Sequence, residues 1–275
     1  MNYHIFQPSA PLKNYVEQYY VFDHAAYLEV EYEMSSTATC YSALVFNFGT
    51  PYRFQNSLGD DYITPQHFMA GFSTSAFRVF PKGKINMLGI VFKGTGLMAL
   101  FPSVKLETLL NKRVSFVALL SSEAEIIAEQ LEKSSDNKEK IAIIDNYLLN
   151  RLERFAEPAT LADKAALLIL GKRGMITIEK VAETLNVGDR HLRRLFSQRL
   201  GINPKLFARI KRFQYVNLCL TQNETLDWQE FLDDGGFYDQ AHFIKDFVAF
   251  CGKAPSAQIL QSKQIVELLT PKETG

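Results

Sequence analysis

The chain has 275 residues, of which 47% are hydrophobic and 22% are charged, as is usual in globular proteins. Its formal net charge is zero, and no apolar run reaches the roughly 20 residues that a membrane-spanning helix needs. The N-terminus also lacks the basic-then-apolar order of a secretory signal. Three widely spaced cysteines, Cys40, Cys219 and Cys251, fit reduced thiols better than a disulfide framework. We therefore expect a cytoplasmic protein without a membrane partner.

The first part of the chain, up to about residue 115, is predicted to form strands and turns. Its strand candidates are short, rich in aromatic and β-branched residues, and bounded by Gly, Pro or Asn. They cover residues 40–49, 67–73, 76–81 and 84–94. Several such runs at close spacing indicate a small barrel or a sandwich. Residues 15–22 fit either a helix or a strand.

Two amphipathic helices are predicted within about residues 121–156. In the second, apolar residues recur at steps of three and four, at Ile141, Ile144, Leu148, Leu152 and Phe155. These helices could pack on their own barrel or pair with a second copy of the chain, and base rates slightly favour the first arrangement. The helical pattern ends at Glu157-Pro158, because a residue before proline avoids helical geometry. We place a domain boundary near residue 158.

The rest of the chain is predicted to be helical. The expected helices span about 160–171, 177–185, 189–200, 203–221, 227–234, 238–250 and 255–261. Thr177 and Asp239 are candidate N-caps, and Gly201 can end a helix in a left-handed conformation. Asn203-Pro204 combines an N-cap with proline at the first helical position.

Charge is distributed unevenly in this helical part. Residues 172–212 contain eleven Lys and Arg but three Asp and Glu, a local balance of +8. Residues 213–260 contain two basic and seven acidic residues, a balance of −5. A basic block inside a neutral chain is typical of a nucleic-acid contact, although a block seen alone is more often a solvated helix face.

Residues 177–201 have the pattern of a helix-turn-helix unit. The predicted inner face, including the turn, comprises Val181, Ala182, Leu185, Val187, Leu192, Leu195, Phe196 and Leu200. The outer face of the second helix comprises Arg190, Arg193, Arg194 and Gln198. Arginine can bind guanine, and glutamine can bind adenine, through paired hydrogen bonds in the major groove. An ordinary helical hairpin with a hydrated basic face is the alternative.

A second helix-turn-helix unit is predicted over residues 225–247. Its inward residues would be Trp228, Phe231, Leu232, Phe243 and Phe247. The long helix over 203–221 would join the two units as a rigid spacer. Two units on one stiff linker can enter successive segments of the major groove.

Residues of about 160–262 resemble the AraC/XylS-type regulators. The resemblance rests on LRRLF at 192–196, GINP at 201–204 leading into ARIKRF, and GGFYDQAHFIKDF at 235–247 with CGKAPS at 251–256. It implies a sequence-specific DNA-binding transcription regulator that binds double-stranded DNA, with RNA polymerase as a further partner of an activator. The base-reading positions that it implies are Arg190, Arg193 and Arg194 in the first unit and Gln240, Ala241, Ile244 and Lys245 in the second.

The chain departs from the family pattern at several positions. Gly188-Asp189 stand where the family often has a capping serine, and Asp189 can still cap. Leu232 replaces a usually small residue. Gln240 and Lys245 are the good hydrogen-bonding groups of the second reading face, so we expect the first unit to supply most affinity and specificity. His242 fits a structural hydrogen bond across the turn better than a phosphate contact.

The N-terminal part resembles the cupin-like sensor or dimerisation domains with trailing helices that such regulators carry. The match rests on residues 11–22, 44–54, 69–101 and 109–116. It implies a small-molecule effector and a homodimer formed through the trailing helices. Aromatic residues that fit a ligand pocket, and fit a plain core better, are Tyr41, Phe46, Phe48, Phe54, Phe72, Phe77 and Phe92. We therefore name no ligand-binding residues.

No enzymatic signature stands out. His4, His24 and His67 are far apart with no His-x-His pair, and we find no catalytic triad, phosphate loop or dinucleotide fingerprint. We expect no catalytic residues, no metal and no cofactor.

The expected fold is α+β: an N-terminal cupin-like β-barrel with trailing helices (1–157), an all-α DNA-binding domain of two helix-turn-helix units joined by a long helix (158–262), and a tail (263–275). Two other functions stay open: a protein-interaction module built on a degenerate helix-turn-helix domain, and a cupin-type enzyme, which would carry bound metal.

Overall fold

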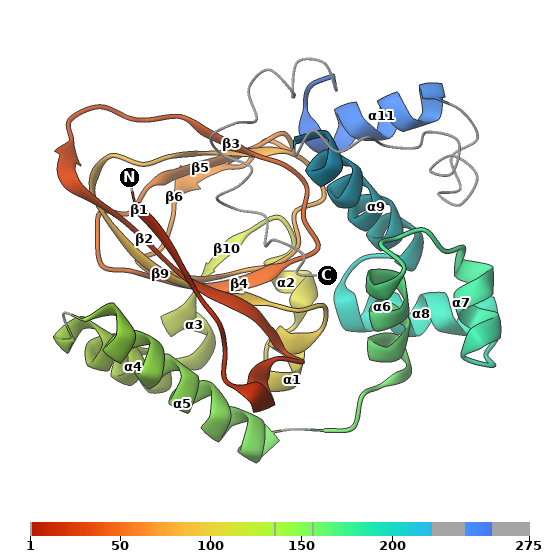
Figure 1. Ribbon diagram of the computed structural model, residues 1–275, viewed down its shortest axis with the longest axis horizontal. Coiled ribbons are helices and arrows are strands. Elements are labelled where there is room, and N and C mark those ends of the chain that lie inside the picture. Colours follow the sequence, from red (N-terminus) through yellow and green to blue (C-terminus); the bar gives the residue numbers. More distant parts are fainter. Residues whose placement is uncertain (1, 135, 156, 222–239, 255–275) are drawn as a thin grey trace. The chain divides into compact units, whose positions relative to one another are not determined.

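The computed structural model describes residues 2–134, 136–155, 157–221 and 240–254 (Figure 1). The predicted helices at 227–234 and 255–261, the tail, the proposed cap Asp239 and the inward residues Trp228, Phe231 and Leu232 lie outside these ranges. Among the described residues, no helix is both long and apolar enough to cross a bilayer.

The chain folds into two compact units. Unit 1 comprises Met1–Met34, Tyr41–Phe72 and Arg78–Pro158, and unit 2 comprises Ser35–Cys40, Ser73–Phe77 and Ala159–Gly275. Two short segments from the first half of the chain therefore belong to unit 2.

The strand-rich part of the chain forms two antiparallel sheets (Figure 1). Sheet A has the order β1 (Asn2–Phe6), β2 (Val16–Leu28), β9 (Gly83–Phe92), β4 (Ser42–Asn47), β7 (His67–Ala70) and β10 (Arg113–Ser115). Sheet B has the order β3 (Met34–Ser36), β8 (Phe77–Phe80), β5 (Arg53–Asn56) and β6 (Asp61–Ile63). The four strands predicted from composition are confirmed, and the ambiguous segment at 15–22 belongs to strand β2 from Val16 onward.

The two sheets do not join into one closed barrel among the described strands. Three of the edge strands, β3, β6 and β10, have three residues each, which leaves few backbone groups to pair across a gap. The predicted sheet-rich domain is thus confirmed in an open form. Its core is aromatic, since Phe46, Phe54, Phe72 and Phe92 are at most 1% exposed.

Strand β2 contains an irregularity near its end. Its pairing with β9 passes from His24↔Ile85 to Leu28↔Gly83. Residues 25–27 of β2 therefore lie opposite Lys84 alone. Extra residues on one strand bend it and interrupt the ladder locally.

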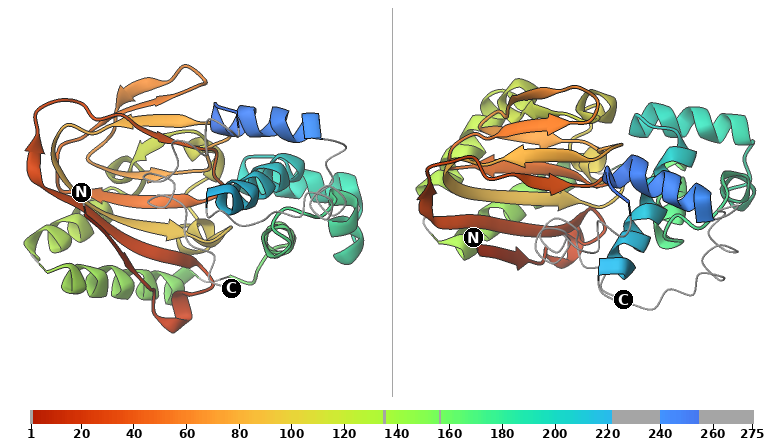
Figure 2. Two further views of the ribbon diagram at one scale, coloured as in Figure 1. Left: turned by 45° about the horizontal axis from the view of Figure 1, so that its top comes forward. Right: turned by 90° about the horizontal axis from the view of Figure 1, so that it is seen from above.

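The helices of unit 1 are short except for the last two. They are η1 (Ala10–Leu12), α1 (Gly96–Leu100), α2 (Leu106–Leu109), α3 (Phe116–Leu120), α4 (Ser122–Lys133) and α5 (Asn137–Phe155). Figure 2 shows α4 and α5 side by side along unit 1. The hydroxyl of Tyr19 on β2 donates to Asp145 Oδ1 at 2.7 Å, and Arg151 donates to the carbonyl of Leu100 at 2.8 Å. The expectation that these helices pack on their own sheet domain is confirmed.

Five of the seven helices expected from the sequence lie within the described residues of unit 2. They are α6 (Leu161–Gly171), α7 (Ile178–Thr184), α8 (Asp189–Leu200), α9 (Pro204–Thr221) and α11 (Gln240–Cys251). Thr160 begins α6 with a reciprocal capping box to Asp163. Gly201 ends α8 with a φ of 72°, and Asn203 Oδ1 accepts the Leu206 N–H at 2.8 Å to begin α9. The predicted roles of Gly201 and Asn203 are confirmed.

Candidate nucleic-acid interface

Helices α7 and α8 form the predicted helix-turn-helix unit. Thr177 caps α7 by accepting the Lys180 N–H at 3.2 Å, as expected. The turn that follows has Asn186 at a φ of 52°, a left-handed conformation that asparagine tolerates. The Val187 N–H then donates to the carbonyl of Ala182 at 3.0 Å, which closes the turn before α8 begins.

The inner face of this unit is apolar and closely packed. Val181, Leu192, Phe196 and Leu200 are fully buried, and Phe196 meets Phe207 of α9 edge to face with ring centroids 5.4 Å apart. Ala182 is also buried, at 4% exposed, and its small side chain allows α7 and α8 to approach closely. The other three expected inner residues, Leu185, Val187 and Leu195, are half-buried. Burial of one face fixes which side of α8 is directed outward.

The outward side of α8 presents three polar residues in one line. Arg190, Arg194 and Gln198 are all exposed and follow one another at steps of four residues, which places them on one helix face. Arg194 Nη1 donates to Gln198 Oε1 at 3.4 Å. In the part of the chain that the structure describes, the Arg190 guanidinium forms no ion pair. We call Arg190, Arg194 and Gln198 the α8 line.

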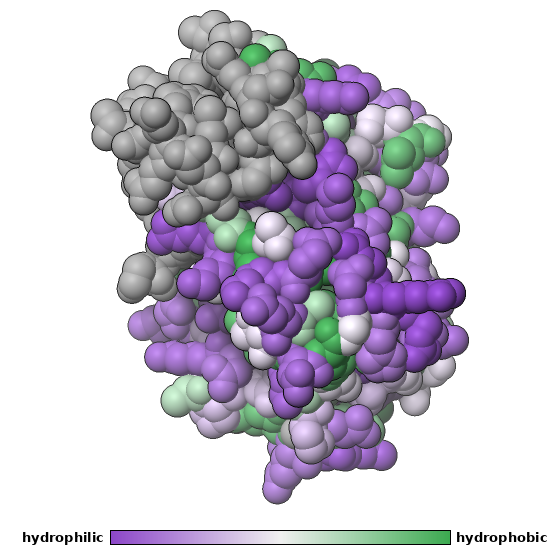
Figure 3. Space-filling model, turned by 90° about the vertical axis from the view of Figure 1, so that its right-hand side faces the viewer, coloured by the Kyte–Doolittle hydropathy of each residue, from purple (hydrophilic) through white to green (hydrophobic). Residues whose placement is uncertain are grey.

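His191 extends this surface and was not singled out from the sequence. It is exposed, and Arg194 Nη2 lies 3.3 Å from its ring Nδ1, which must accept because a guanidinium only donates. Its position three residues before Arg194 on a helix was the available signal. Figure 3 views the side on which α7 and α8 are drawn in Figure 1, and hydrophilic residues predominate over the coloured part of that face.

Arg193 is held differently from the α8 line. Its Nε donates to Asp189 Oδ2 at 2.6 Å and its Nη2 donates to Glu179 Oε1 at 3.0 Å. The hydrogen bond that Arg193 donates to the Asp189 carboxylate raises the pKa of Arg193. Because Glu179 lies on α7, Arg193 ties the two helices of the unit together.

The expected cap of α8 is wrong. Gly188 is the N-cap and makes no side-chain cap hydrogen bond, while Asp189 is the first helical residue. The carboxylate of Asp189 is directed to Arg193 instead of the backbone, because an ion pair four residues along the helix competes for the same oxygen atoms. Its negative charge still interacts favourably with the helix N-terminus.

The basic block of residues 172–212 is less available than its charge count suggests. Lys180 pairs with Glu183 at 2.9 Å, Arg199 with Asp163 at 3.3 Å, and Arg209 donates to Asp246 at 3.0 Å. Lys211 and Arg212 are 4% and 8% exposed, and burial lowers the pKa of Arg212. Much of the local positive charge therefore stabilises the fold of unit 2.

The second predicted reading face lies on α11. Ile244 and Lys245 are exposed there, whereas Asp246 and Phe247 are buried. Phe247 packs against Phe213 of α9 with ring centroids 5.1 Å apart, as its inward assignment predicted. Backbone atoms place residues 240–243 in α11, but the side chains of Gln240, Ala241, His242 and Phe243 lie outside the described part.

Residues 181–258 match the model of a family described as a helix-turn-helix domain. The match begins within α7 and includes α8, α9 and α11. These residues therefore form an AraC-type helix-turn-helix domain, and the chain is a DNA-binding transcription regulator. Residues 4–115 of the regulator match a family described as a domain of unknown function (DUF6597). Among curated protein sequences, none matches the regulator significantly.

Solved structures similar to the regulator include ToxT from Vibrio cholerae, at 11% identity, with 88% of this chain and 97% of that chain covered and a TM-score of 0.48. The C-terminal domain of AraT, a response regulator from Geobacillus stearothermophilus, is 24% identical over 38% of this chain and 88% of that chain, with a TM-score of 0.33. The AraC-like transcriptional activator CuxR is 13% identical over 82% and 90%, with a TM-score of 0.31. At these identities and TM-scores, the ligands and operators of those proteins are not transferred to this chain.

Chemistry of other kinds has little to build on in the described residues. No group of three His, Cys, Asp or Glu lies close enough there to hold a metal ion. Cys40, Cys219 and Cys251 are buried and form no disulfide, and burial raises the pKa of Cys251 to about 11, so this thiol is poorly nucleophilic.

Proposed function

We propose that the regulator reads its operator mainly with the α8 line, inserted into the major groove. An α-helix fits that groove, and arginine and glutamine can each make paired hydrogen bonds to a base edge. The observation that carries the proposal is the contrast on α8 itself. Arg190, Arg194 and Gln198 are exposed, whereas Arg193 is held by two carboxylates of its own unit.

Arg193 belongs to the same interface in a supporting role. Its ion pairs orient α7 against α8, and that orientation sets the angle at which the α8 line meets the bases. Lys245 and Gln240 on α11 contribute fewer contacts, because the net negative charge of residues 213–260 is repelled by the DNA phosphates.

The proposed DNA-binding domain comprises residues 158–262, followed by the tail at 263–275.

The test is fluorescence anisotropy with DNA from upstream of the regulator's own gene, over a series of salt concentrations. The double variant Arg190→Ala, Arg194→Ala removes the α8 line's positive charges. The control variant Lys133→Ala, Lys138→Ala removes two exposed charges from α4 and α5 of unit 1. Each good bidentate contact should contribute about 1–3 kcal/mol of discrimination.

The expected result is tight binding that weakens steeply with salt, loses sequence preference in the α8 variant and keeps it in the control. Equal binding of any duplex by all three proteins would contradict the proposed reading helix. No measurable DNA affinity at any salt concentration would favour the other candidate function, a protein-interaction module. The exposed apolar residues Ile244 and Val248 on α11, 40% and 42% exposed, suit a protein partner.

For residues 1–157 we propose the role of a sensor and dimerisation domain, with no catalytic step and a cytoplasmic location. The regulator would act as a homodimer through α4 and α5, where Ile126 is 57% exposed. The Ile126→Glu variant places a charge in this proposed contact, so the molar mass measured by light scattering should fall from that of a dimer to that of a monomer. As an activator it would recruit RNA polymerase, which transcription reconstituted from purified components tests directly.

A further inference from the structure

A hollow of about 560 Å³ lies in unit 1 between the irregular end of β2, the neighbouring part of β9 and the start of α5. Residues 25–27, the extra residues of β2 opposite Lys84, form part of its wall. An interrupted ladder directs side chains away from the regular pleat, and such irregularities are over-represented next to functional sites. The volume falls in the usual range for small-molecule sites.

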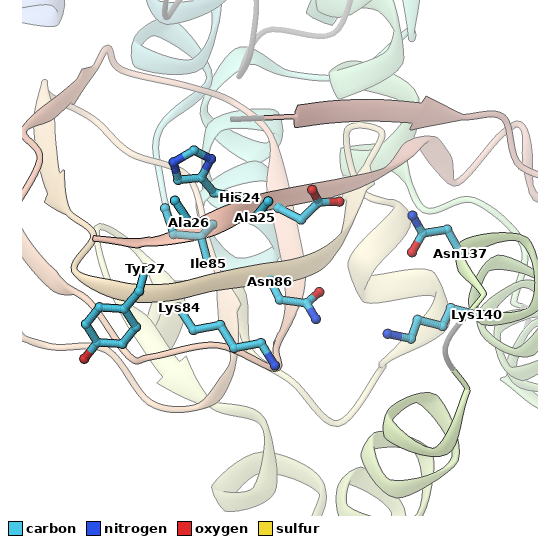
Figure 4. Close-up of a pocket in the computed structure, with 10 residues that line it drawn as sticks. His24, Ala25, Ala26, Tyr27, Lys84, Ile85, Asn86, Asn137 and Lys140 are labelled. Atoms are coloured by element: carbon cyan, nitrogen blue, oxygen red, sulfur yellow. The ribbon is translucent and has the colours of Figure 1, made fainter. Parts of the chain in front are cut away.

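The hollow is lined by basic and amide side chains from two elements. Figure 4 shows Lys84 and Asn86 reaching from β9 toward Asn137 and Lys140, which belong to α5. Two ammonium groups and two carboxamides supply hydrogen-bond donors of different geometry at one place.

Lys140 is the decisive residue, because it is 8% exposed and yet directed into the hollow. Its Nζ lies 4.6 Å from the centroid of the Phe48 ring, an arrangement in which the ring face attracts the cation. Among the described residues, Lys140 Nζ has no carboxylate within ion-pair distance and no hydrogen-bond acceptor. A nearly buried lysine whose ammonium group has no carboxylate in ion-pair contact is rare, since burying an unpaired charge is costly.

The surroundings do not neutralise this charge. Burial lowers the pKa of Lys140, the positive charge of Lys84 lowers it further, and the more distant Glu132 opposes both. Asp23 also lines the hollow, and its Oδ1 already accepts a hydrogen bond from Asn2 at 2.9 Å. One carboxylate against two ammonium groups leaves the lining positive.

We propose that this hollow binds a small molecule through an oxyanion group, a phosphate or a carboxylate, held between Lys84 and Lys140. Lysine ammonium groups bind phosphate and carboxylate as point charges, and the Asn86 and Asn137 amides can each donate a further hydrogen bond.

The inference rests on the proposed sensor role of unit 1 for its biological meaning, but its test does not. Binding is measured by isothermal titration calorimetry on the full chain without DNA, with inorganic phosphate in one arm and succinate in the other. Failure of the DNA experiment therefore leaves this result unaffected, and the reverse also holds.

Three single variants sharpen the test. Lys140→Met and Lys84→Met remove the two charges that line the hollow. Lys138→Met is the matched control, since this exposed lysine lies on the same helix and does not line the hollow. Circular dichroism confirms that each variant is folded. Should Lys140→Met unfold, the comparison of the exposed Lys84 with Lys138 decides the matter.

We expect at least one of the two anions to bind, with affinity about tenfold or more lower in Lys140→Met and lowered in Lys84→Met, as for charge-assisted hydrogen bonds. Lys138→Met should bind like wild type. The arm that binds identifies the ligand group as phosphate, carboxylate or either. No heat from either anion at millimolar concentration, or equal affinities in all variants, would overturn the proposal.

Discussion

Replacing Arg193 by alanine separates orientation of the reading helix from base recognition. The guanidinium of Arg193 is 35% exposed, and its two partners, Asp189 and Glu179, are 42% and 71% exposed. Ion pairs this accessible to water contribute about 0.2–1 kcal/mol each. Both together should therefore contribute roughly 1 kcal/mol to the stability of unit 2.

The effect on DNA should be of a different kind from that of Arg190→Ala. Without its two ion pairs, α7 is held less firmly against α8, so affinity for every duplex should fall by a similar factor. Arg190 makes no ion pair among the described residues, so Arg190→Ala should leave stability unchanged. It should nevertheless lower the ratio of specific to non-specific affinity about 5- to 150-fold, the equivalent of about 1–3 kcal/mol.

The measurement is a pair of anisotropy titrations for each variant, with the operator and with a scrambled duplex of equal length at one salt concentration. Urea unfolding followed by circular dichroism reports stability in parallel. If Arg193→Ala reduced the ratio of affinities as much as Arg190→Ala, then Arg193 would exchange its carboxylates for a base, and the proposed supporting role would be refuted.

Three further predictions concern other residues. Arg209→Met should destabilise unit 2 by about 3 kcal/mol, because it leaves the Asp246 carboxylate, which is 4% exposed, without its guanidinium partner. Asp246→Leu should destabilise unit 2 less, since the Arg209 side chain that it leaves unpaired is 33% exposed to water. Equal losses of stability in urea unfolding would contradict this asymmetry. Lys140→Met should raise the stability of unit 1 at pH 7. Because the pKa of Lys140 is lower in the folded state than in the unfolded state, the wild-type protein gains stability as pH rises from the folded-state pKa to the ordinary lysine pKa. The melting temperatures of wild type and variant, followed by circular dichroism, should therefore converge at alkaline pH. Lys245→Ala should weaken operator binding less than Arg190→Ala does in anisotropy titrations, and an equal loss would assign the second unit an equal share.

Most of the helical architecture could be predicted because its signals are local. Thr177, Gly201 and Asn203 act within one turn of the helix that they begin or end, so neighbouring residues suffice to place them. The strands of unit 1 could also be predicted from composition. The segment at 15–22 could not, because consecutive residues of β2 are buried, as at 18–19 and 21–22, so the segment lacks the alternation that distinguishes a strand from a helix.

The candidate interface was predictable only in part. The sequence identified four polar residues on the outer face of α8 but could not distinguish Arg193 from Arg190, and the expectation that Asp189 caps the helix was wrong. Both points have one origin. Which partner a charged side chain chooses depends on distances between helices, and Glu179 comes within 3.0 Å of Arg193 only after α7 folds back on α8.

The sequence by itself determined the kind of domain, since the helix-turn-helix pattern, its caps and its apolar inner face depend on spacings of a few residues. Only the tertiary structure decided which charges stay available. It buried Lys211, paired Arg209 with Asp246, and brought Lys84 and Lys140, distant in the chain, to the same hollow. The physical reason is that electrostatic interactions depend on separation in space and on burial, and neither quantity is encoded in local sequence.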